Sequence, residues 1–381
     1  MKFSIYGVNF QNKGAELMLH AVNQQISQWD RDYILAAHSK IGSFQQRREL
    51  GINHLSYRPS NKVPFTTDLI SAAANMIPKP VRQHYKITLE SEVDIVLDAS
   101  GFAFSDQWGP EDTERMANLC LKWKKQSKKI ILLPQAFGPF TSERIKQAFL
   151  TILNNVDLIF ARDPVSYDLI SELSSSMNNV KIAPDFTNLV KGLEPKYIQD
   201  LIGRPCIIPN YRMIDKTSSK ASTVYVQFLA ELINHLLERG LEPFILIHET
   251  NDYKLGTQLQ AEVNKKVPIV IDNNPLYLKG ILGKCQLLIG SRFHGLVSAL
   301  SQGIPCLGAG WSHKYQMLFD SYNCSELLIN PEGNLNESIE KLDSIIDEPS
   351  RSEIMEAIKI ASENQKVLSR QMWSDIKRML T

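Results

Sequence analysis

The chain alternates short apolar runs with longer segments in which apolar residues recur at helical spacing. Lys2–Tyr6 is a predicted buried strand, and after Ala15 a helix is expected with Met18 and Val22 on one face. Further strands are expected at 94–98, 130–133, 158–161 and 180–183, with helices at 111–126, 142–155 and 164–174. Strands that alternate with helices form βαβ units, so the pattern predicts a parallel sheet.

A second series follows a proline- and glycine-rich reset at 193–209. Strands are expected at 206–208, 243–247, 269–272, 287–289 and 305–307, with helices at 221–239, 253–265, 275–284, 294–302 and 314–321, and a long helix after Pro349. A length of 381 residues also favours about two domains. We therefore expect an α/β protein with two Rossmann-like domains that face a cleft, at 1–195 and 203–348, and a C-terminal helix at 349–381. A ligand belongs beyond the carboxyl ends of the strands.

Composition narrows the class of protein. Lys and Arg number 42 against 41 Asp and Glu, a net charge of +1, which argues against a nucleic-acid partner. The five cysteines are scattered without a CxxC pair, as expected of reduced thiols in the cytoplasm, and suggest no metal site. The start of the chain has no signal-peptide pattern, and no apolar run has the ~18 residues of a membrane span.

The segment 68–86 departs from the alternation. It has an alanine-rich apolar part, then two prolines, then Lys79, Arg82, His84 and Lys86. Two interpretations stay open: a connecting helix packed on the domain, or a patch that contacts anionic lipid. The second would add a peripheral location at the inner face of the membrane.

The stretch 287–320 carries the most chemistry. A buried strand ends at Gly290, and Ser291, Arg292, Phe293, His294 and Gly295 follow at the start of a helix. Backbone N–H groups, the positive end of the helix dipole and a guanidinium suit an anion, and a histidine suits proton transfer. The alternative is that Arg292 pairs with a structural carboxylate and His294 caps the helix. A similar turn at 308–314 ends in Lys314.

Loops after other predicted strands supply further candidates. The loop 99–109 contains Gly101, Asp106 and Trp108, a combination common where sugars bind, although Asp106 could equally cap a turn and Trp108 pack. For Arg162–Asp163 a structural role at a helix start is favoured over catalysis. Four more candidates follow strands: Asn9, Asn12 and Gly14 in the first loop, and Gln135. Arg212 is either a cleft cation or a solvated loop arginine. No Walker A loop, GxGxxG, HExxH or GxSxG motif is present.

Together these pieces resemble the polysaccharide pyruvyl transferase family. The segments that carry the resemblance are NFQNKGAEL at 9–17, SGF at 100–102 with Asp106, PQAFGP at 134–139, ARDPVS at 161–166, APD at 183–185, and SRFHG at 291–295 followed by GIP and Lys314. Ala15 departs from the family's usual acidic residue, and the run of glycines near Gly101 is reduced. These departures fall on the presumed acceptor side.

The resemblance implies a glycosyltransferase-B-like fold whose last helix crosses back to the N-terminal domain. It also implies transfer of pyruvate from phosphoenolpyruvate to two hydroxyls of a sugar, without a metal or cofactor. The donor side would contain Arg292, Arg212, Ser291, Gly295 and Lys314, with His294 as acid and Asp106 as base. The acceptor side would contain Asn9, Asn12, Gly14, Gly101, Trp108 and Gln135.

The acceptor is then a sugar of a surface polysaccharide or of its precursor, such as a polyprenyl-diphosphate-linked oligosaccharide. Two other functions stay open: a glycosyltransferase with a nucleotide-sugar donor, and a sugar-binding protein without catalysis. A glycosyltransferase should have a carboxylate for sugar or ribose hydroxyls in the second domain, and the sequence shows none at a matching offset.

Overall fold

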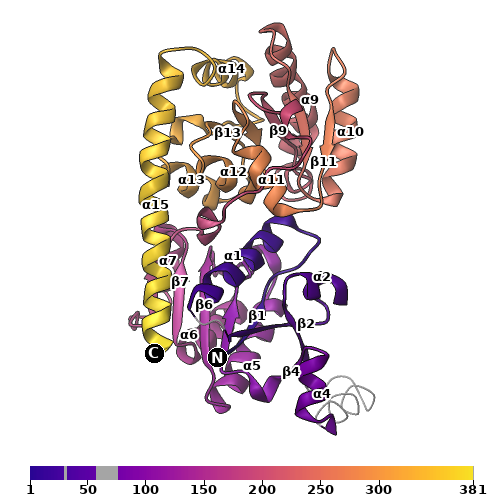
Figure 1. Cartoon of the computed structure of the whole chain (residues 1–381). Coiled ribbons are helices and arrows are strands. Elements are labelled where there is room, and N and C mark those ends of the chain that lie inside the picture. Colours follow the sequence, from indigo (N-terminus) through magenta and orange to yellow (C-terminus); the bar gives the residue numbers. More distant parts are fainter. Residues whose placement is uncertain (30–31, 57–75, 381) are drawn as a thin grey trace. The chain divides into compact units, whose positions relative to one another are not determined.

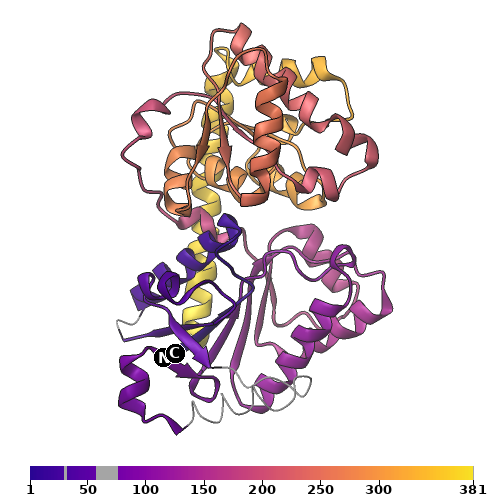
Figure 2. The ribbon, with the colours of Figure 1, turned by 90° about the vertical axis from the view of Figure 1, so that its right-hand side faces the viewer.

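The structure is a computed structural model that describes residues 1–29, 32–56 and 76–380. It divides into two compact units, one of Met1–Phe10 and Met18–Pro184 and one of Gln11–Leu17 and Asp185–Thr381. Each unit is a parallel sheet with helices on both faces (Figures 1 and 2). Two Rossmann-like α/β domains are therefore confirmed. The first unit gives way to the second at Pro184, whereas the sequence pattern placed the change at residue 195.

The sheet of the first unit has, among the described residues, eight parallel strands in the order β4-β3-β2-β1-β5-β6-β7-β8. Apolar side chains such as Trp123 and Phe149 fill the space between the sheet and its helices. Its strands are β1 (Lys2–Tyr6), β2 (Ile34–His38), β3 (Asn53–Ser56), β4 (Ile87–Leu89), β5 (Ile95–Asp98), β6 (Lys129–Gln135), β7 (Leu158–Ala161) and β8 (Val180–Ile182). Its helices are α1 (Lys13–Trp29), whose residues up to Leu17 belong to the second unit, α2 (Phe44–Glu49), α4 (Lys79–His84), α5 (Glu111–Lys125), α6 (Glu143–Asn155) and α7 (Pro164–Ser171).

The sheet of the second unit has five parallel strands in the described part of the chain, in the order β11-β10-β9-β12-β13. Its strands are β9 (Cys206–Ile208), β10 (Phe244–Ile247), β11 (Ile269–Ile271), β12 (Leu288–Gly290) and β13 (Cys306–Gly308). Its helices are α8 (Arg212–Asp215), α9 (Ser219–Glu238), α10 (Tyr253–Glu262), α11 (Pro275–Leu282), α12 (Phe293–Leu300), α13 (His313–Ser321), α14 (Leu335–Ser344) and α15 (Ser350–Leu380).

Each sheet contains a point where the strand order reverses. In the first unit, β1 lies between β2 and β5, and in the second, β9 lies between β10 and β12. The connections that leave the two adjacent strands β1 and β5 run in opposite directions, as do those that leave β9 and β12, so a crevice opens at the carboxyl ends of each pair. The fold thus marks one ligand position at β1 and β5 and another at β9 and β12.

Helix α15 is the long C-terminal helix that the sequence predicts. Its buried face includes Ile358, Met372 and Trp373, and the ring of Trp373 packs edge-on against Phe186 at 5.6 Å. A crossing of this helix to the N-terminal domain stays a prediction.

The segment 68–86 lies partly outside the described residues. In its described part, the side chain of Arg82 is buried and its guanidinium binds Glu92 at 2.7 Å, so this charge is not available to a lipid surface. Lys79 and Lys86 are exposed. Within the described ranges, no helix is both long enough and apolar enough to span a membrane.

Candidate functional site

The turn between β12 and α12 lies at the reversal of strand order in the second unit. Ser291 occupies this turn with no solvent exposure. Its carbonyl accepts hydrogen bonds from Asn210, which follows β9, and from the Tyr315 hydroxyl at 2.9 Å, while its own hydroxyl accepts from Tyr225 at 3.0 Å. The contacts shown for Ser291 therefore hold the two loops together at the carboxyl ends of β9 and β12.

Arg292 follows in the same turn and is bound by two carboxylates. Its Nε donates to the wholly buried Asp252 at 2.8 Å, its Nη2 donates to the same carboxylate, and its Nη1 pairs with Glu249. Burial acts to lower the pKa of Arg292, but the two carboxylates outweigh it and raise the pKa. Of the two alternatives for Arg292, the structure shows the pairing with structural carboxylates. One positive charge faces two negative ones, which disfavours a further anion; donor binding by Arg292 stays a prediction.

His294 lies in the first turn of α12, where segments distant in the sequence meet. Its Nε2 is 3.3 Å from Oδ2 of Asp185, a distance at which a protonated ring forms an ion pair. Within the described part of the chain, this Nε2 atom forms no hydrogen bond. On the other side, a Cβ added to Gly14 would lie 2.2 Å from Nδ1. The ring therefore needs a glycine at position 14. Gly14, predicted for the acceptor side, and His294 lie in the same unit.

Asp185 is held in place by its neighbours. Its Oδ1 accepts hydrogen bonds from the Thr187 backbone N–H at 3.0 Å and from the Thr187 hydroxyl. Lys279 donates to the Thr187 carbonyl at 3.0 Å and to the Ser301 hydroxyl at 3.1 Å. Burial lowers the pKa of Lys279 to about 7, although the charge of Asp185 acts in the opposite direction. The sequence placed Asp185 after a strand but gave no sign of its histidine partner.

The remaining residues predicted for the donor side lie in the second unit, Gly295 beside His294 in α12 and Lys314 with its ammonium 5.4 Å from the centre of the Phe293 ring. Gly295 is buried, and a Cβ there would lie 3.0 Å from Ile208. Lys314 is buried in the first turn of α13, with its ammonium 4.4 Å from the centre of the Trp311 ring. The side chain of Arg212 is 37% exposed, and its guanidinium pairs with Asp215 at 2.5 Å. This environment agrees better with the alternative of a solvated loop arginine than with a cation of the cleft.

The loop after β1 leads into α1 and caps its N-terminus. The side chain of Asn12 caps the helix by accepting hydrogen bonds from the backbone N–H groups of Gly14 at 2.9 Å and Ala15 at 3.2 Å. Asn12 also forms an isolated antiparallel bridge with Glu249, the carboxylate partner of Arg292. Asn12 and Gly14 therefore belong to the surroundings of His294, and half-buried Asn9 lies just before them in the first unit.

The other residues predicted for the acceptor side lie in the first unit. Gly101 has a φ of 72°, a conformation that favours glycine. Trp108 packs edge-on against Phe102 at 6.4 Å, so the packing alternative describes it. Gln135 is wholly buried at the end of β6, and its Nε2 donates to Asp98 at 2.9 Å.

Asp106, the predicted base, caps the turn that precedes α6. Its carboxylate accepts hydrogen bonds from the backbone N–H groups of Thr141 at 2.6 Å and Ser142 at 3.1 Å. Burial acts to raise the pKa of Asp106, but these bonds outweigh it and lower the pKa, which makes a weaker base. The structure therefore shows the capping alternative. Asp163 likewise caps α7 through the Ser166 N–H at 2.7 Å, as expected for a structural residue.

A cavity of about 160 Å³ lies beside the loop after β10. Lys13, His248, Glu249 and Asp272 are among the residues that line it. Burial, followed by the charge of Arg292, lowers the pKa of His248 to about 3, so this ring is neutral at physiological pH. These residues could not be predicted from a motif, because the loop matches none; the run His248–Glu249 directly after a strand is their only signal in the sequence. Within the described ranges, no three His, Cys, Asp or Glu side chains are grouped to hold a metal ion.

Comparison with known proteins connects these residues to a family. A family model described as polysaccharide pyruvyl transferase matches residues 12–313, a span that includes Gly14, Asp185 and His294. The amylovoran biosynthesis protein AmsJ of Erwinia amylovora is 23% identical over 307 residues, which cover 75% of this chain and 72% of that protein.

Solved structures show the same architecture. HepE of Anabaena, determined with UDP and glucose, has a TM-score of 0.60 at 10% identity and matches over 98% of each chain. The UDP-GlcNAc 2-epimerase of Neisseria meningitidis, bound to UDP-GlcNAc, has a TM-score of 0.59 at 11% identity over 99% of this chain and 100% of its own. These likenesses confirm a glycosyltransferase-B-like fold.

Proposed function

Because the chain belongs to the polysaccharide pyruvyl transferase family, we propose that it transfers pyruvate from phosphoenolpyruvate to two hydroxyls of one sugar and releases phosphate. The sugar is part of a surface polysaccharide or of its lipid-linked precursor. The protein acts in the cytoplasm or at the inner face of the membrane. No cofactor is required, because the donor itself carries the activated group.

The contact between His294 and Asp185 carries this proposal. A titratable ring lies at the start of α12, at the strand-order reversal where ligands bind, and a buried carboxylate lies 3.3 Å from its Nε2. The Asp185 carboxylate faces Nε2 of the ring, and the close approach of the backbone at Gly14 fixes the position of the ring. An imidazole in this setting suits the delivery of a proton to substrate.

The reaction needs one group that can give a proton in the first step and take one back in the second. In the first step a sugar oxygen forms a bond to the central carbon of phosphoenolpyruvate, and the methylene carbon takes a proton from His294 to become a methyl group. The hydroxyl proton passes to the donor's own phosphate group. In the second step another hydroxyl attacks the same carbon, the bond to phosphate breaks, and the neutral His294 accepts the hydroxyl proton. The ketal and phosphate are formed, and His294 is protonated again.

The donor carries a phosphate and a carboxylate, so its pocket needs cations. Lys314 suits this role because it is buried at the start of a helix of nine residues and its ammonium lies over aromatic rings. Its charge and the positive end of the helix dipole favour an anion. Arg212 is a second candidate, since its guanidinium lies at a partly exposed position, where its ion pair with Asp215 is weakened by solvent.

Two assays test the function. Phosphoenolpyruvate should raise the melting temperature of the protein, since a ligand that binds only the native state stabilises it, and UDP-sugars should not. With an acceptor present, phosphate should be released. A melting shift with a UDP-sugar and none with phosphoenolpyruvate would instead establish the glycosyltransferase alternative.

A pair of variants tests the role of His294. His294→Gln should lower kcat by about 10²- to 10⁴-fold, the usual contribution of a general acid, and leave the melting shift with phosphoenolpyruvate unchanged. His235→Gln is the matched control, because His235 also faces a carboxylate in the same unit, Asp343 at 2.7 Å, but lies on α9. Normal turnover by His294→Gln would show that another group supplies the proton.

A further inference from the structure

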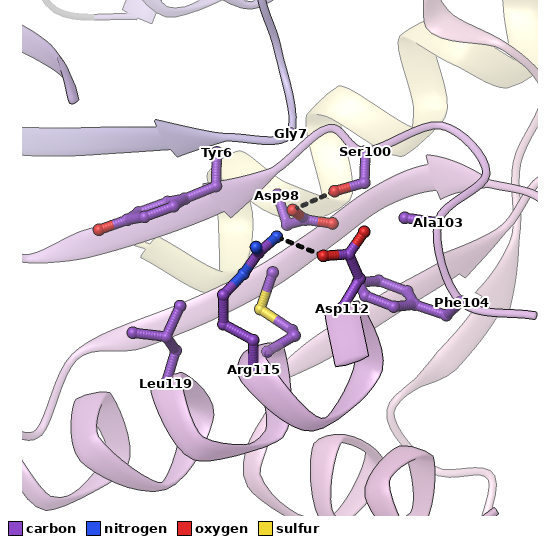
Figure 3. Close-up of a pocket in the computed structure, with 10 residues that line it drawn as sticks. Tyr6, Gly7, Asp98, Ser100, Ala103, Phe104, Asp112, Arg115 and Leu119 are labelled. Carbon is purple, nitrogen blue, oxygen red and sulfur yellow. Dashed lines mark hydrogen bonds and ion pairs between the residues drawn. The ribbon is translucent and has the colours of Figure 1, made fainter. Parts of the chain in front are cut away.

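A second cavity, of about 230 Å³, lies in the first unit. Its walls come from the end of β1, the loop after β5 and the first turns of α5 (Figure 3). These are the strands on either side of the order reversal, and Tyr6 and Asp98, their last residues, are direct partners in the sheet. In open parallel sheets this crevice is where ligands bind, so the cavity lies at the ligand position of its unit.

Close contact between two loops shapes one end of the cavity. Gly7, directly after β1, has a φ of 77°, and a Cβ there would lie 2.4 Å from the backbone nitrogen of Ser100. Backbone atoms cannot give way as a flexible side chain can, so this position requires glycine. The loops after β1 and β5 therefore touch at Gly7 and Ser100, both of which line the cavity.

The polar groups of the cavity come from both sides. Asp98 is 1% exposed; its Oδ1 accepts a hydrogen bond from the Ser100 hydroxyl at 2.7 Å, and its Oδ2 accepts one from Gln135 at 2.9 Å. From α5, Asp112 and Arg115 form an ion pair at 2.9 Å with substantial exposure. Figure 3 shows their charged ends extending toward Asp98, at the end of β5, and Ser100, in the loop after it.

The lining selects the class of ligand. The one guanidinium of the cavity already pairs with Asp112, and Asp98 adds a carboxyl group whose pKa is raised by burial, so the lining offers no surplus of positive charge for an anion such as phosphoenolpyruvate. Carboxylate, guanidinium and hydroxyl groups can bind hydroxyls, while Phe104, Met116 and Leu119 offer apolar surface to a C–H face. The volume is below the roughly 300 Å³ at which pockets for drug-sized ligands begin, which limits the occupant to one small ring.

We propose that this cavity binds one neutral hexose unit of the acceptor glycan, with Asp112 and Arg115 as ligands for its hydroxyls. The assignment of that hexose to the acceptor rests on the function proposed above; the binding of a hexose here does not.

Saturation-transfer NMR with the methyl β-D-glycosides of glucose, galactose and mannose tests the proposal. At least one glycoside should receive saturation from the wild-type protein. Asp112→Asn and Arg115→Gln should each weaken its binding about ten-fold or more, because a hydrogen bond to a charged group is lost. The matched control is Arg144→Gln, which breaks an ion pair that α6 makes with Glu114 of the same helix α5 at 2.8 Å, and should bind like the wild type. All three variants should keep the melting temperature of the wild type to within a few degrees.

Two results would overturn the proposal: no saturation of any of the three glycosides, or equal binding by Asp112→Asn, Arg115→Gln and the control. The melting shift with phosphoenolpyruvate serves as the separate readout of the donor. If that shift is absent while the two variants lose glycoside binding, the proposed pyruvyl transfer fails and the sugar site stands. If the shift is present while the variants bind normally, the sugar site fails and the transfer stands.

Discussion

Replacing Gly14 by Ala should misplace the His294 ring. The added Cβ would lie 2.2 Å from Nδ1, whereas ordinary contact begins at 3.4 Å, so the ring or the start of α1 must move by about 1.2 Å. A displacement of about 1 Å at a reacting group can cost about 10²-fold in rate, and we expect that loss in kcat. The clash should also lower the free energy of unfolding by about 1–3 kcal/mol, the usual result of overpacking.

The same substitution should have the opposite effect on stability when the ring is absent. Gly14 lies in the first turn of α1, and alanine in a helix is favoured over glycine by up to about 1 kcal/mol. In a His294→Gly background, Gly14→Ala should therefore leave the stability unchanged or raise it, and should cost no further activity. Urea unfolding and initial rates of phosphate release measure the four proteins of this cycle. If Gly14→Ala alone is as active and stable as the wild type, the ring does not lie against Gly14 as described.

Three further changes test the groups around the site. Arg292→Ala should destabilise the protein by about 3–5 kcal/mol in urea unfolding, since it leaves the buried charge of Asp252 without its cation. A wild-type melting curve with weakened donor binding would instead show that Arg292 binds donor. Asp106→Asn should destabilise at neutral pH, and because the native pKa of Asp106 is lowered, the difference from the wild type should vanish as the pH falls below that pKa; a difference independent of pH would contradict this. The pKa of Lys279 is lowered to about 7, so between pH 7 and about 10 the unfolded chain binds more protons than the native protein. Over that range the free energy of unfolding, relative to that of Lys279→Met, should rise by up to about 1.4 kcal/mol per pH unit. Parallel pH profiles of the two proteins would refute this expectation.

The sequence predicted the strands that are buried on both faces and missed those near one edge of the first sheet. Strands such as β7 and β9 are uninterrupted apolar runs, and their bounds agree with the prediction. Strands β2, β3 and β4 have the sequences ILAAH, NHLS and ITL, which are short or partly polar. They form by parallel pairing with their neighbours, which extends outward from β1 through β2 and β3 to β4. Such pairing joins residues far apart in the chain and therefore leaves no local pattern in the sequence.

The candidate site was predictable as a set of motifs but not as a set of contacts. A strand followed directly by a helix start is a local pattern, and it placed Arg292 and His294 correctly at a β–α turn. The partners are not local: Asp252 precedes Arg292 by 40 residues and lies beyond a different strand. Which carboxylate faces a cation depends on strand order and register. For the same reason the sequence left open whether Asp106 would cap a turn or remain available as a base.

The division of the chain between its units has a consequence during protein synthesis. Gln11–Leu17 is flanked by residues of the first unit, yet it belongs to the second, where its Gly14 lies against His294. A ribosome that adds about 5–20 residues per second synthesises His294 roughly 14–55 s after Leu17. The first unit can therefore fold while this short segment still awaits its partners. A gene fragment that encodes only residues 185–381 would produce a second unit that lacks the surface against which the His294 ring rests.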